Sequence, residues 1–157
     1  MSLYHPHAQT KDGSKFREAV AVCIKALEQI EGKYDIIAVR GASGTVIGSV
    51  VAYQLNKLLM VVRKNNERVH CYQVYSMYGE PRPERTVFLD DFIERGGTYR
   101  AIIKALGAPP MWVMLYSDYT FQLYNKEQHL LQDTGMDRIY TPMTNRGFRL
   151  APTEEPR

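Results

Sequence analysis

Hydrophobic positions in this chain follow a helical period in some stretches and form short continuous runs in others. From Ser14 to about Glu31, apolar residues recur every three or four positions, which predicts an amphipathic helix that stops at Gly32. Further helical patterns cover about 45–56 and 98–106. Short apolar runs predict strands at 36–39, 58–62, 71–75, 86–89 and 111–116.

The helical and strand patterns alternate along most of the chain. This order predicts an α/β fold with an open, mainly parallel, twisted sheet flanked by helices. Beyond Ser117 the periodicity weakens, and polar, glycine and aromatic residues mix. We therefore expect a single domain over 1–157, with a core at about 14–116 and a small C-terminal hood at about 117–150.

The composition is typical of a globular chain. Its 157 residues are 45% hydrophobic and carry a net charge of +3, which is too small to indicate nucleic-acid binding but suits a phosphorylated ligand. Cys23 and Cys71 both lie in apolar patterns and are expected to be reduced thiols. No apolar stretch reaches the ~18 residues of a membrane span, and the first ten residues lack a signal-peptide pattern. A cytoplasmic location without membrane contact is the resulting expectation.

The run Thr86–Thr98, with the sequence TVFLDDFIERGGT, carries the clearest chemical signal. A buried strand ends in Asp90 and Asp91, at the edge where open α/β sheets bind their ligands. Gly96 and Gly97 allow a tight turn whose N–H groups converge on an anion at the start of the next helix. Carboxylates beside a phosphate cradle suit a phosphorylated ribose. The alternative is a strand–turn–helix in which the acids only cap the helix.

A second candidate site follows the strand at 36–39. Arg40, Gly41, Ala42, Ser43 and Gly44 form a loop of small residues before a helix, which predicts an anion-binding turn. The loop matches neither a dinucleotide fingerprint nor a Walker A motif. An ordinary strand–helix turn, or a loop for another nucleotide, is the alternative.

The acidic motif resembles the motif that binds phosphoribosyl pyrophosphate (PRPP) in the type I phosphoribosyltransferases. The resemblance covers roughly 35–116 and adds the VRGASG loop and the VRK sequence at 62–64. It implies that Asp90 and Asp91 hold the ribose 2′ and 3′ hydroxyls, and that the 5′-phosphate is bound by the loop after them, namely by Arg95, Gly96, Gly97 and Thr98. Arg95 replaces the usual threonine, so its guanidinium either substitutes by charge or occupies the pocket.

The same resemblance assigns the pyrophosphate to the other two motifs. It implies that pyrophosphate is bound by Arg40, Gly41, Ala42 and Ser43, together with Arg63 and Lys64. An Arg-Lys pair at this position is a feature of the adenine and orotate branches. A pair of solvated charges at the end of a strand is the alternative reading of Arg63 and Lys64.

The sequence does not decide which nucleobase is the acceptor. Glu94 resembles the aspartate that acts on the purine ring in the 6-oxopurine branch, but it is one methylene longer. It is equally explained as a surface acid that pairs with Arg95 or with the helix start. Lys126 and one aromatic residue are further candidates for holding the base, the aromatic candidates being Trp112, Tyr116, Tyr119 and Phe121.

The resemblance thus implies a type I phosphoribosyltransferase-like fold and a phosphoribosyltransferase that moves 5-phosphoribose from PRPP to a nucleobase, with a purine favoured. Asp90, Asp91 and Glu94 are the implied catalytic residues. Mg²⁺ is the implied cofactor, bound through PRPP rather than directly by protein side chains, and a homodimer is the implied assembly. The alternatives are a regulatory module on the same fold that binds PRPP or a nucleotide without catalysis, and a kinase-like or pyrophosphokinase-like relative.

Overall fold

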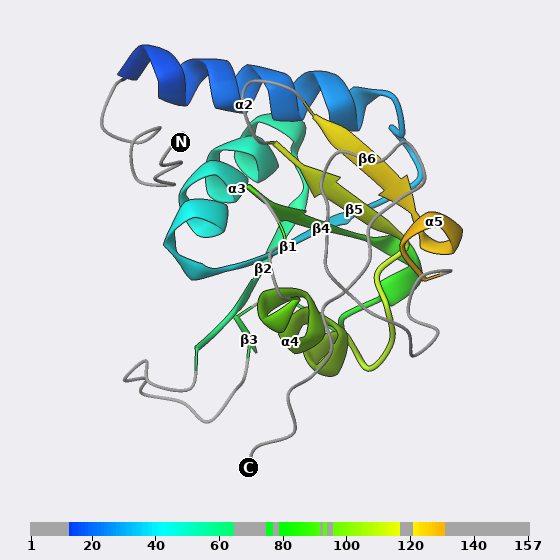
Figure 1. The fold of residues 1–157 in the computed structure, drawn as a ribbon. Coiled ribbons are helices and arrows are strands. Elements are labelled where there is room, and N and C mark those ends of the chain that lie inside the picture. Colours follow the sequence, from blue (N-terminus) through cyan, green and yellow to red (C-terminus); the bar gives the residue numbers. More distant parts are fainter. Residues whose placement is uncertain are drawn as a thin grey trace.

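A six-stranded sheet forms the centre of the computed structural model (Figure 1). The structure describes residues 13–64, 75–76, 79–91, 93, 96–116 and 121–130, and the statements below concern these residues. The strand order is β3-β2-β1-β4-β5-β6, in which the four central strands run parallel and the two edge strands are antiparallel to their neighbours. The predicted fold class, an open and mainly parallel sheet flanked by helices, is therefore confirmed.

The helices and strands lie close to their predicted positions. The helices are α2 (Gly13–Glu28), α3 (Gly41–Leu55), α4 (Gly97–Leu106) and the short α5 (Lys126–Leu130), with a 3₁₀ turn η1 (Pro83–Arg85). The strands are β1 (Ile36–Arg40), β2 (Leu58–Val62), β3 (Tyr75–Ser76), β4 (Thr86–Asp90), β5 (Trp112–Leu115) and β6 (Gln122–Asn125).

Helices cover both faces of the sheet, which explains the continuous apolar runs in its strands. Figure 1 shows α2 and α3 on one face and α4 on the other. In β1, Ile37 and Val39 pack against the α2–α3 face, whereas Ile36 and Ala38 pack against the face that α4 covers. Cys23 of α2 is a buried free cysteine in the first of these cores, as predicted.

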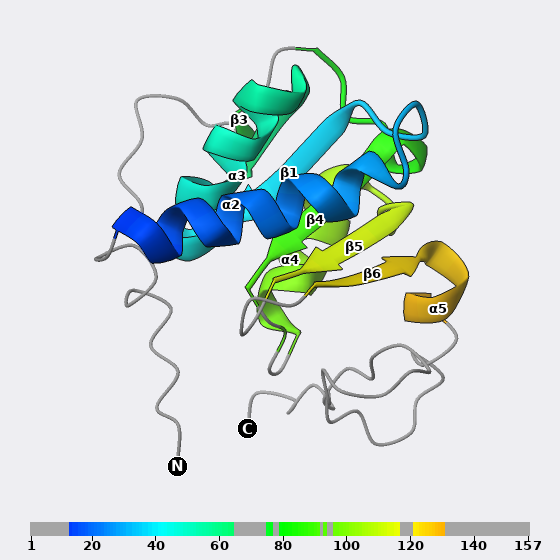
Figure 2. The same ribbon diagram turned by 90° about the horizontal axis from the view of Figure 1, so that it is seen from above.

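The direction of winding reverses between β1 and β4. The chain leaves β1 through α3 to reach β2 on one side, and leaves β4 through α4 to reach β5 on the other side (Figure 2). At such a reversal the connecting loops diverge and open a crevice beyond the carboxyl ends of the two strands, where α/β sheets bind ligands. The reversal in this sheet lies beyond Arg40 of β1 and Asp90 of β4, and this region is called the crevice below. We expect a ligand site there.

The predicted start of the helix that follows β1 is wrong. The loop predicted at 40–44 is helical from Gly41 onward, so it forms the first turn of α3. Close packing explains this, because a Cβ atom on Gly48 would lie 2.5 Å from Cγ1 of Val39. The glycines let α3 lie directly on the sheet, and this contact outweighs their low helix propensity.

The described residues include only part of the strand predicted at 71–75 and of the predicted C-terminal hood. The strand expected at 71–75 corresponds in the described residues to Tyr75–Ser76, and 71–74 lie outside them. Gln122–Asn125 join the sheet as the edge strand β6 beside β5. Most of the hood expected at about 117–150 lies outside the described residues, so its existence stays a prediction.

Ion pairs lie at the amino ends of the parallel strands, opposite the crevice. The guanidinium of Arg85 donates to both carboxylate oxygens of Asp35, at 2.8 and 2.9 Å, and Arg82 donates to the same carboxylate at 3.0 Å. The hydrogen bond from Arg85 lowers the pKa of Asp35. These contacts link the residue before β1 to the turn before β4 and so hold the two strands that flank the crevice in register.

Two buried tyrosines offer a matched test of hydrogen bonding in the core. Tyr34 and Tyr99 are 0% and 1% exposed. The hydroxyl of Tyr99 lies 2.6 Å from Nδ1 of His129, whereas that of Tyr34 has no hydrogen-bond partner among the described residues. We expect Tyr99→Phe to lower the free energy of unfolding by about 1–3 kcal/mol and Tyr34→Phe to leave it unchanged or raise it. Urea unfolding of both variants checks this, and equal losses would contradict it.

His129 should make stability depend on pH. Its side chain is buried, and burial is the main cause that lowers its pKa from 6.5 to about 4. The unfolded chain therefore binds a proton between pH 6.5 and 4 that the folded chain does not, so this contribution to stability is lost as the pH falls through that window. The loss is on the order of 2 kcal/mol. Urea unfolding at pH 7 and pH 4.5 should show a larger drop for the wild type than for His129→Gln, and identical drops would refute the assignment.

Candidate active site

A pair of buried acids stands at the end of β4. Asp90 and Asp91 are 7% and 5% exposed, and the backbone N–H of Asp91 donates to Oδ1 of Asp90 at 2.9 Å. Burial, followed by the hydrogen bond and the charge of Asp91, raises the pKa of Asp90 well above its usual value. The N–H of Asp91 and the charge of Lys64 act in the opposite direction. The pair is thus a hydrogen-bonding unit whose charge is costly in the absence of a polar or cationic partner.

The start of α3 faces the acid pair. Gly41 has a φ of +81°, Arg40 occupies the N-cap in an extended conformation without a side-chain capping bond, and the first turn contains no acid. The N–H groups of this turn are therefore available to an anion. A Cβ atom on Gly44 would lie 3.4 Å from the backbone oxygen of Leu89 and 3.6 Å from Oδ1 of Asp90, so the turn touches the end of β4.

Lys64 brings a positive charge to the same turn. A Cβ atom on Gly41 would lie 3.5 Å from Cε and 3.6 Å from Nζ of Lys64, so the ammonium group lies over this glycine. Arg63, the preceding residue, is half-buried. Nε of Arg40 is buried and has no hydrogen-bond partner among the described residues. The three predicted motifs that follow β1, β2 and β4 therefore meet at one edge of the sheet.

The start of α4 forms a second open helix end. Gly96 has a φ of +80° at the N-cap, makes no side-chain capping bond, and is followed by a first turn without acids. The N–H of Arg100 donates to the backbone oxygen of Gly96 at 2.8 Å and closes this turn. Gly97 is exposed and Thr98 half-buried, so both are accessible to a ligand. Glu94 and Arg95 lie outside the described residues, and their roles stay predictions.

Two of the candidates for holding the base lie at the wrong edge of the sheet. Trp112 begins β5 and pairs with Asn125, so both Trp112 and the following Lys126 lie at the amino ends of the parallel strands. There Lys33 lies 5.9 Å from the centre of the Trp112 ring. A periodicity of apolar residues cannot distinguish the two ends of a strand, which explains the error. Tyr116 lies at the carboxyl edge, and Tyr119 lies outside the described residues.

Among the described residues at this edge, Tyr116 makes two contacts that the sequence did not predict. Its hydroxyl donates to the backbone oxygen of Ser43 at 3.2 Å, and its backbone N–H donates to that of Asp90 at 3.2 Å. The only signal in the sequence was its position directly after a strand.

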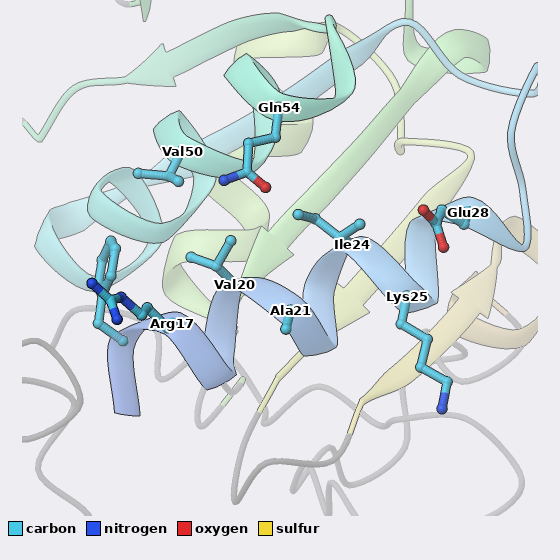
Figure 3. A pocket seen from close by; sticks show the side chains of 9 residues that line it. Arg17, Val20, Ala21, Ile24, Lys25, Glu28, Val50 and Gln54 are labelled. Carbon is cyan, nitrogen blue, oxygen red and sulfur yellow. The ribbon is translucent and has the colours of Figure 1, made fainter. Parts of the chain in front are cut away.

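A separate pocket lies between α2 and α3 (Figure 3), and neither the acid pair nor the first turns of α3 and α4 line it. Its volume is about 400 Å³, and its walls are mainly apolar, with Val20 and Ile24 from α2 and Val50 from α3. Within the described residues, no group of three or more histidine, cysteine or acidic side chains could hold a metal ion, and no helix is long and apolar enough to cross a membrane.

No protein-family model matches the chain, but individual relatives do. It is 37% identical over 97 residues to the adenine phosphoribosyltransferase of Pseudomonas syringae pv. syringae, which covers 50% of this chain and 52% of that protein. It is 28% identical over 109 residues to the enzyme of the same name from Thermosipho africanus, covering 60% and 62%. The transcriptional regulator GfcR 2 of Methanosarcina barkeri is 30% identical over 109 residues, covering 64% and 54%. The chain thus spans between half and two thirds of the length of these relatives.

Solved structures of adenine phosphoribosyltransferases match the chain in fold. The adenine phosphoribosyltransferase of Saccharomyces cerevisiae, complexed with an imino-altritol bisphosphate and adenine, matches with a TM-score of 0.55 at 19% identity, covering 69% of this chain and 70% of that one. The enzyme from Thermoanaerobacter pseudethanolicus matches with a TM-score of 0.52 at 24% identity, covering 68% and 70%. The chain has the fold of the type I phosphoribosyltransferases.

The buried carboxyl group of Asp90 should reduce stability at neutral pH. Because the pKa of Asp90 is raised by folding, its contribution to stability falls as the pH rises from its unfolded value through its folded value. Asp90→Asn keeps the acceptor for the N–H of Asp91 and removes the buried charge. We expect a higher Tm than wild type at pH 7 and a smaller difference at pH 4.

Thermal unfolding at both pH values checks this expectation. Glu18→Gln, which removes an exposed acid of α2, is the matched control and should not change Tm at either pH. A lower Tm for Asp90→Asn at pH 7 would contradict the assigned direction.

Proposed function

We propose that the crevice beyond β1 and β4 binds PRPP and that the protein transfers its phosphoribosyl group to a nucleobase, releasing pyrophosphate. The observation that supports this best is the buried acid pair with an open helix start on each side. A ligand that fills the site must carry hydroxyl groups between two anionic groups. PRPP has this arrangement, with a pyrophosphate at C1, hydroxyls at C2 and C3, and a phosphate at C5.

In this proposal the acid pair orients the sugar. Asp90 and Asp91 accept hydrogen bonds from the 2′ and 3′ hydroxyls, which gives these buried carboxylates additional polar partners. The 5′-phosphate binds at the start of α4, to the N–H groups that follow Gly96 and to Thr98. The resemblance adds Arg95, which lies outside the described residues, to this phosphate site. Binding at this remote phosphate fixes the orientation of the ribose.

The pyrophosphate binds at the start of α3. The N–H groups of Gly41, Ala42 and Ser43 point to it, and Lys64 adds a cation above Gly41. Arg40 and Arg63 supply further positive charge at the edge of the turn. These groups stabilise the negative charge that grows on the leaving pyrophosphate as the bond to C1 breaks.

Mg²⁺ is expected to arrive on PRPP. Pyrophosphate oxygens are hard ligands that suit this ion, which keeps several waters when it binds. The oxygens of Asp90 and Asp91 fit hydrogen bonds to such waters and to the ribose hydroxyls. When bound, Mg²⁺ neutralises charge on the leaving group.

The transfer then follows from the charges of the site. Departure of pyrophosphate leaves positive charge on the ribose ring, and the acid pair beneath the ring stabilises it. A ring nitrogen of the base attacks the opposite face of C1, so that the configuration is inverted. The helix start of α3 holds the leaving group and α4 holds the 5′-phosphate, so neither end moves while the bond is exchanged.

Adenine is the acceptor that we place first. The Pseudomonas and Thermosipho relatives are adenine phosphoribosyltransferases. By the resemblance described above, the pair Arg63 and Lys64 is a feature of the adenine and orotate branches. Glu94 favours a 6-oxopurine instead. The homodimer that the resemblance implies is part of this proposal and can be tested by sedimentation.

Pyrophosphate release is the direct test. Full-length protein with PRPP and Mg²⁺ should release pyrophosphate when adenine is supplied, and more slowly with hypoxanthine, guanine or orotate. Lys64→Gln should raise KM for PRPP about tenfold or more, because a hydrogen bond to a charged group contributes about 1.5–3 kcal/mol. Lys104→Gln removes an exposed lysine of α4 and is the matched control, with an unchanged KM expected.

A regulatory module is the second candidate, and the likeness to the regulator GfcR 2 favours it. The same experiment separates the two functions. Binding of PRPP in calorimetry, with no release for any base, would support the regulatory reading and reject the enzyme. Absence of PRPP binding would reject the enzyme and a module that senses PRPP, and would leave only a module that binds a nucleotide.

A further inference from the structure

Tyr116 connects the two halves of the crevice. It directly follows β5 and its side chain is 2% exposed, within the core on the α2–α3 face of the sheet. Its backbone N–H donates to the oxygen of Asp90, and its hydroxyl donates to the oxygen of Ser43, both at 3.2 Å. One residue is therefore bonded to the strand that carries the acid pair and to the first turn of α3.

The bond to Ser43 acts on the part of α3 that matters for an anion. The backbone oxygen of Ser43 has two lone pairs, so it can accept the hydroxyl in addition to the bond within the helix. Fixing the peptide group of Ser43 also fixes the direction of the N–H groups in the first turn of α3. The turn has no side-chain cap and contains two glycines, so it has few restraints of its own.

We propose that Tyr116 is a positioning residue for the pyrophosphate part of the site. It holds the first turn of α3 at a constant distance from Asp90, so that the sugar and the leaving group are bound in one geometry. The inference rests on the proposed function. It also assigns Tyr116 a role other than contact with the base, because its hydroxyl is directed to Ser43 and its ring is buried.

We expect loss of the Tyr116 hydroxyl to affect the placement of the substrate more than the stability of the fold. A single neutral hydrogen bond at 3.2 Å contributes about 1 kcal/mol to folding, so Tyr116→Phe should remain folded. A small displacement of groups that hold a reacting substrate can nevertheless lower the rate by up to about 100-fold. The two consequences can therefore be measured separately.

The test compares Tyr116→Phe with Tyr124→Phe in the full-length protein. Tyr124 also carries a hydroxyl in a hydrogen bond, to Oε1 of Gln122 at 2.9 Å, but it packs in the core on the α4 face. Amide hydrogen exchange of the free proteins is measured at 45–47, because in α3 the N–H groups of these residues donate to the backbone oxygens of 41–43. Calorimetry measures the affinity for Mg²⁺–pyrophosphate and for ribose 5-phosphate, which probe the two ends of the crevice.

We expect Tyr116→Phe to exchange faster at 45–47, to bind Mg²⁺–pyrophosphate about tenfold more weakly and to bind ribose 5-phosphate as the wild type does. KM for PRPP should rise more than kcat falls. Tyr124→Phe should match the wild type throughout. Unchanged exchange at 45–47, or equal losses for both ligands, would overturn the inference. A wild-type protein that binds neither ligand would instead reject the proposed function, and the exchange data would still decide whether Tyr116 fixes the turn.

Discussion

The close contact between α3 and the sheet determines the geometry of the crevice. Gly48 lies so near Val39 that any side chain at that position would collide with it, and Gly44 lies against the end of β4. This contact brings the first turn of α3 to the carboxylate of Asp90. A helix held a few ångströms farther away by ordinary side chains would leave its N–H groups too distant to share a ligand with the acid pair. The glycines therefore serve packing and, in the proposed function, ligand binding as well.

The crevice combines acidic side chains with the positive ends of two helices. This combination suits a ligand with both hydroxyl and anionic groups. Asp90 and Asp91 are buried, and burial is the main cause that raises the pKa of Asp90, whereas the charge of Lys64 lowers it. Both neighbouring helices direct their positive ends to the same edge without an acid in their first turns. The buried charge of Asp90 lowers stability, which is common at functional sites, and in the proposed function a bound ligand offsets this loss.

Most of the fold could be predicted because both faces of the sheet are buried. A strand covered on both sides reads as a continuous apolar run, as in β4, and an amphipathic helix such as α2 shows its period directly. The start of α3 was misplaced because its small residues have low helix propensity, and only their contact with Val39 and Leu89 makes the helix favourable there. Trp112 and Lys126 were misplaced because periodicity carries no information about which end of a strand faces the ligand.

The sequence by itself determined the chemistry available to this protein: two adjacent acids after a strand, two glycine-led helix starts, and an Arg-Lys pair after another strand. These are local patterns, and local patterns specify what a segment can bind. Only the tertiary structure decided that the three segments meet, because the reversal of winding brings together the ends of β1 and β4, at Arg40 and Asp90, which lie 50 positions apart in the chain. It also decided the part played by Tyr116, since a hydrogen bond between the residue after β5 and the first turn of α3 depends on packing that no local pattern encodes.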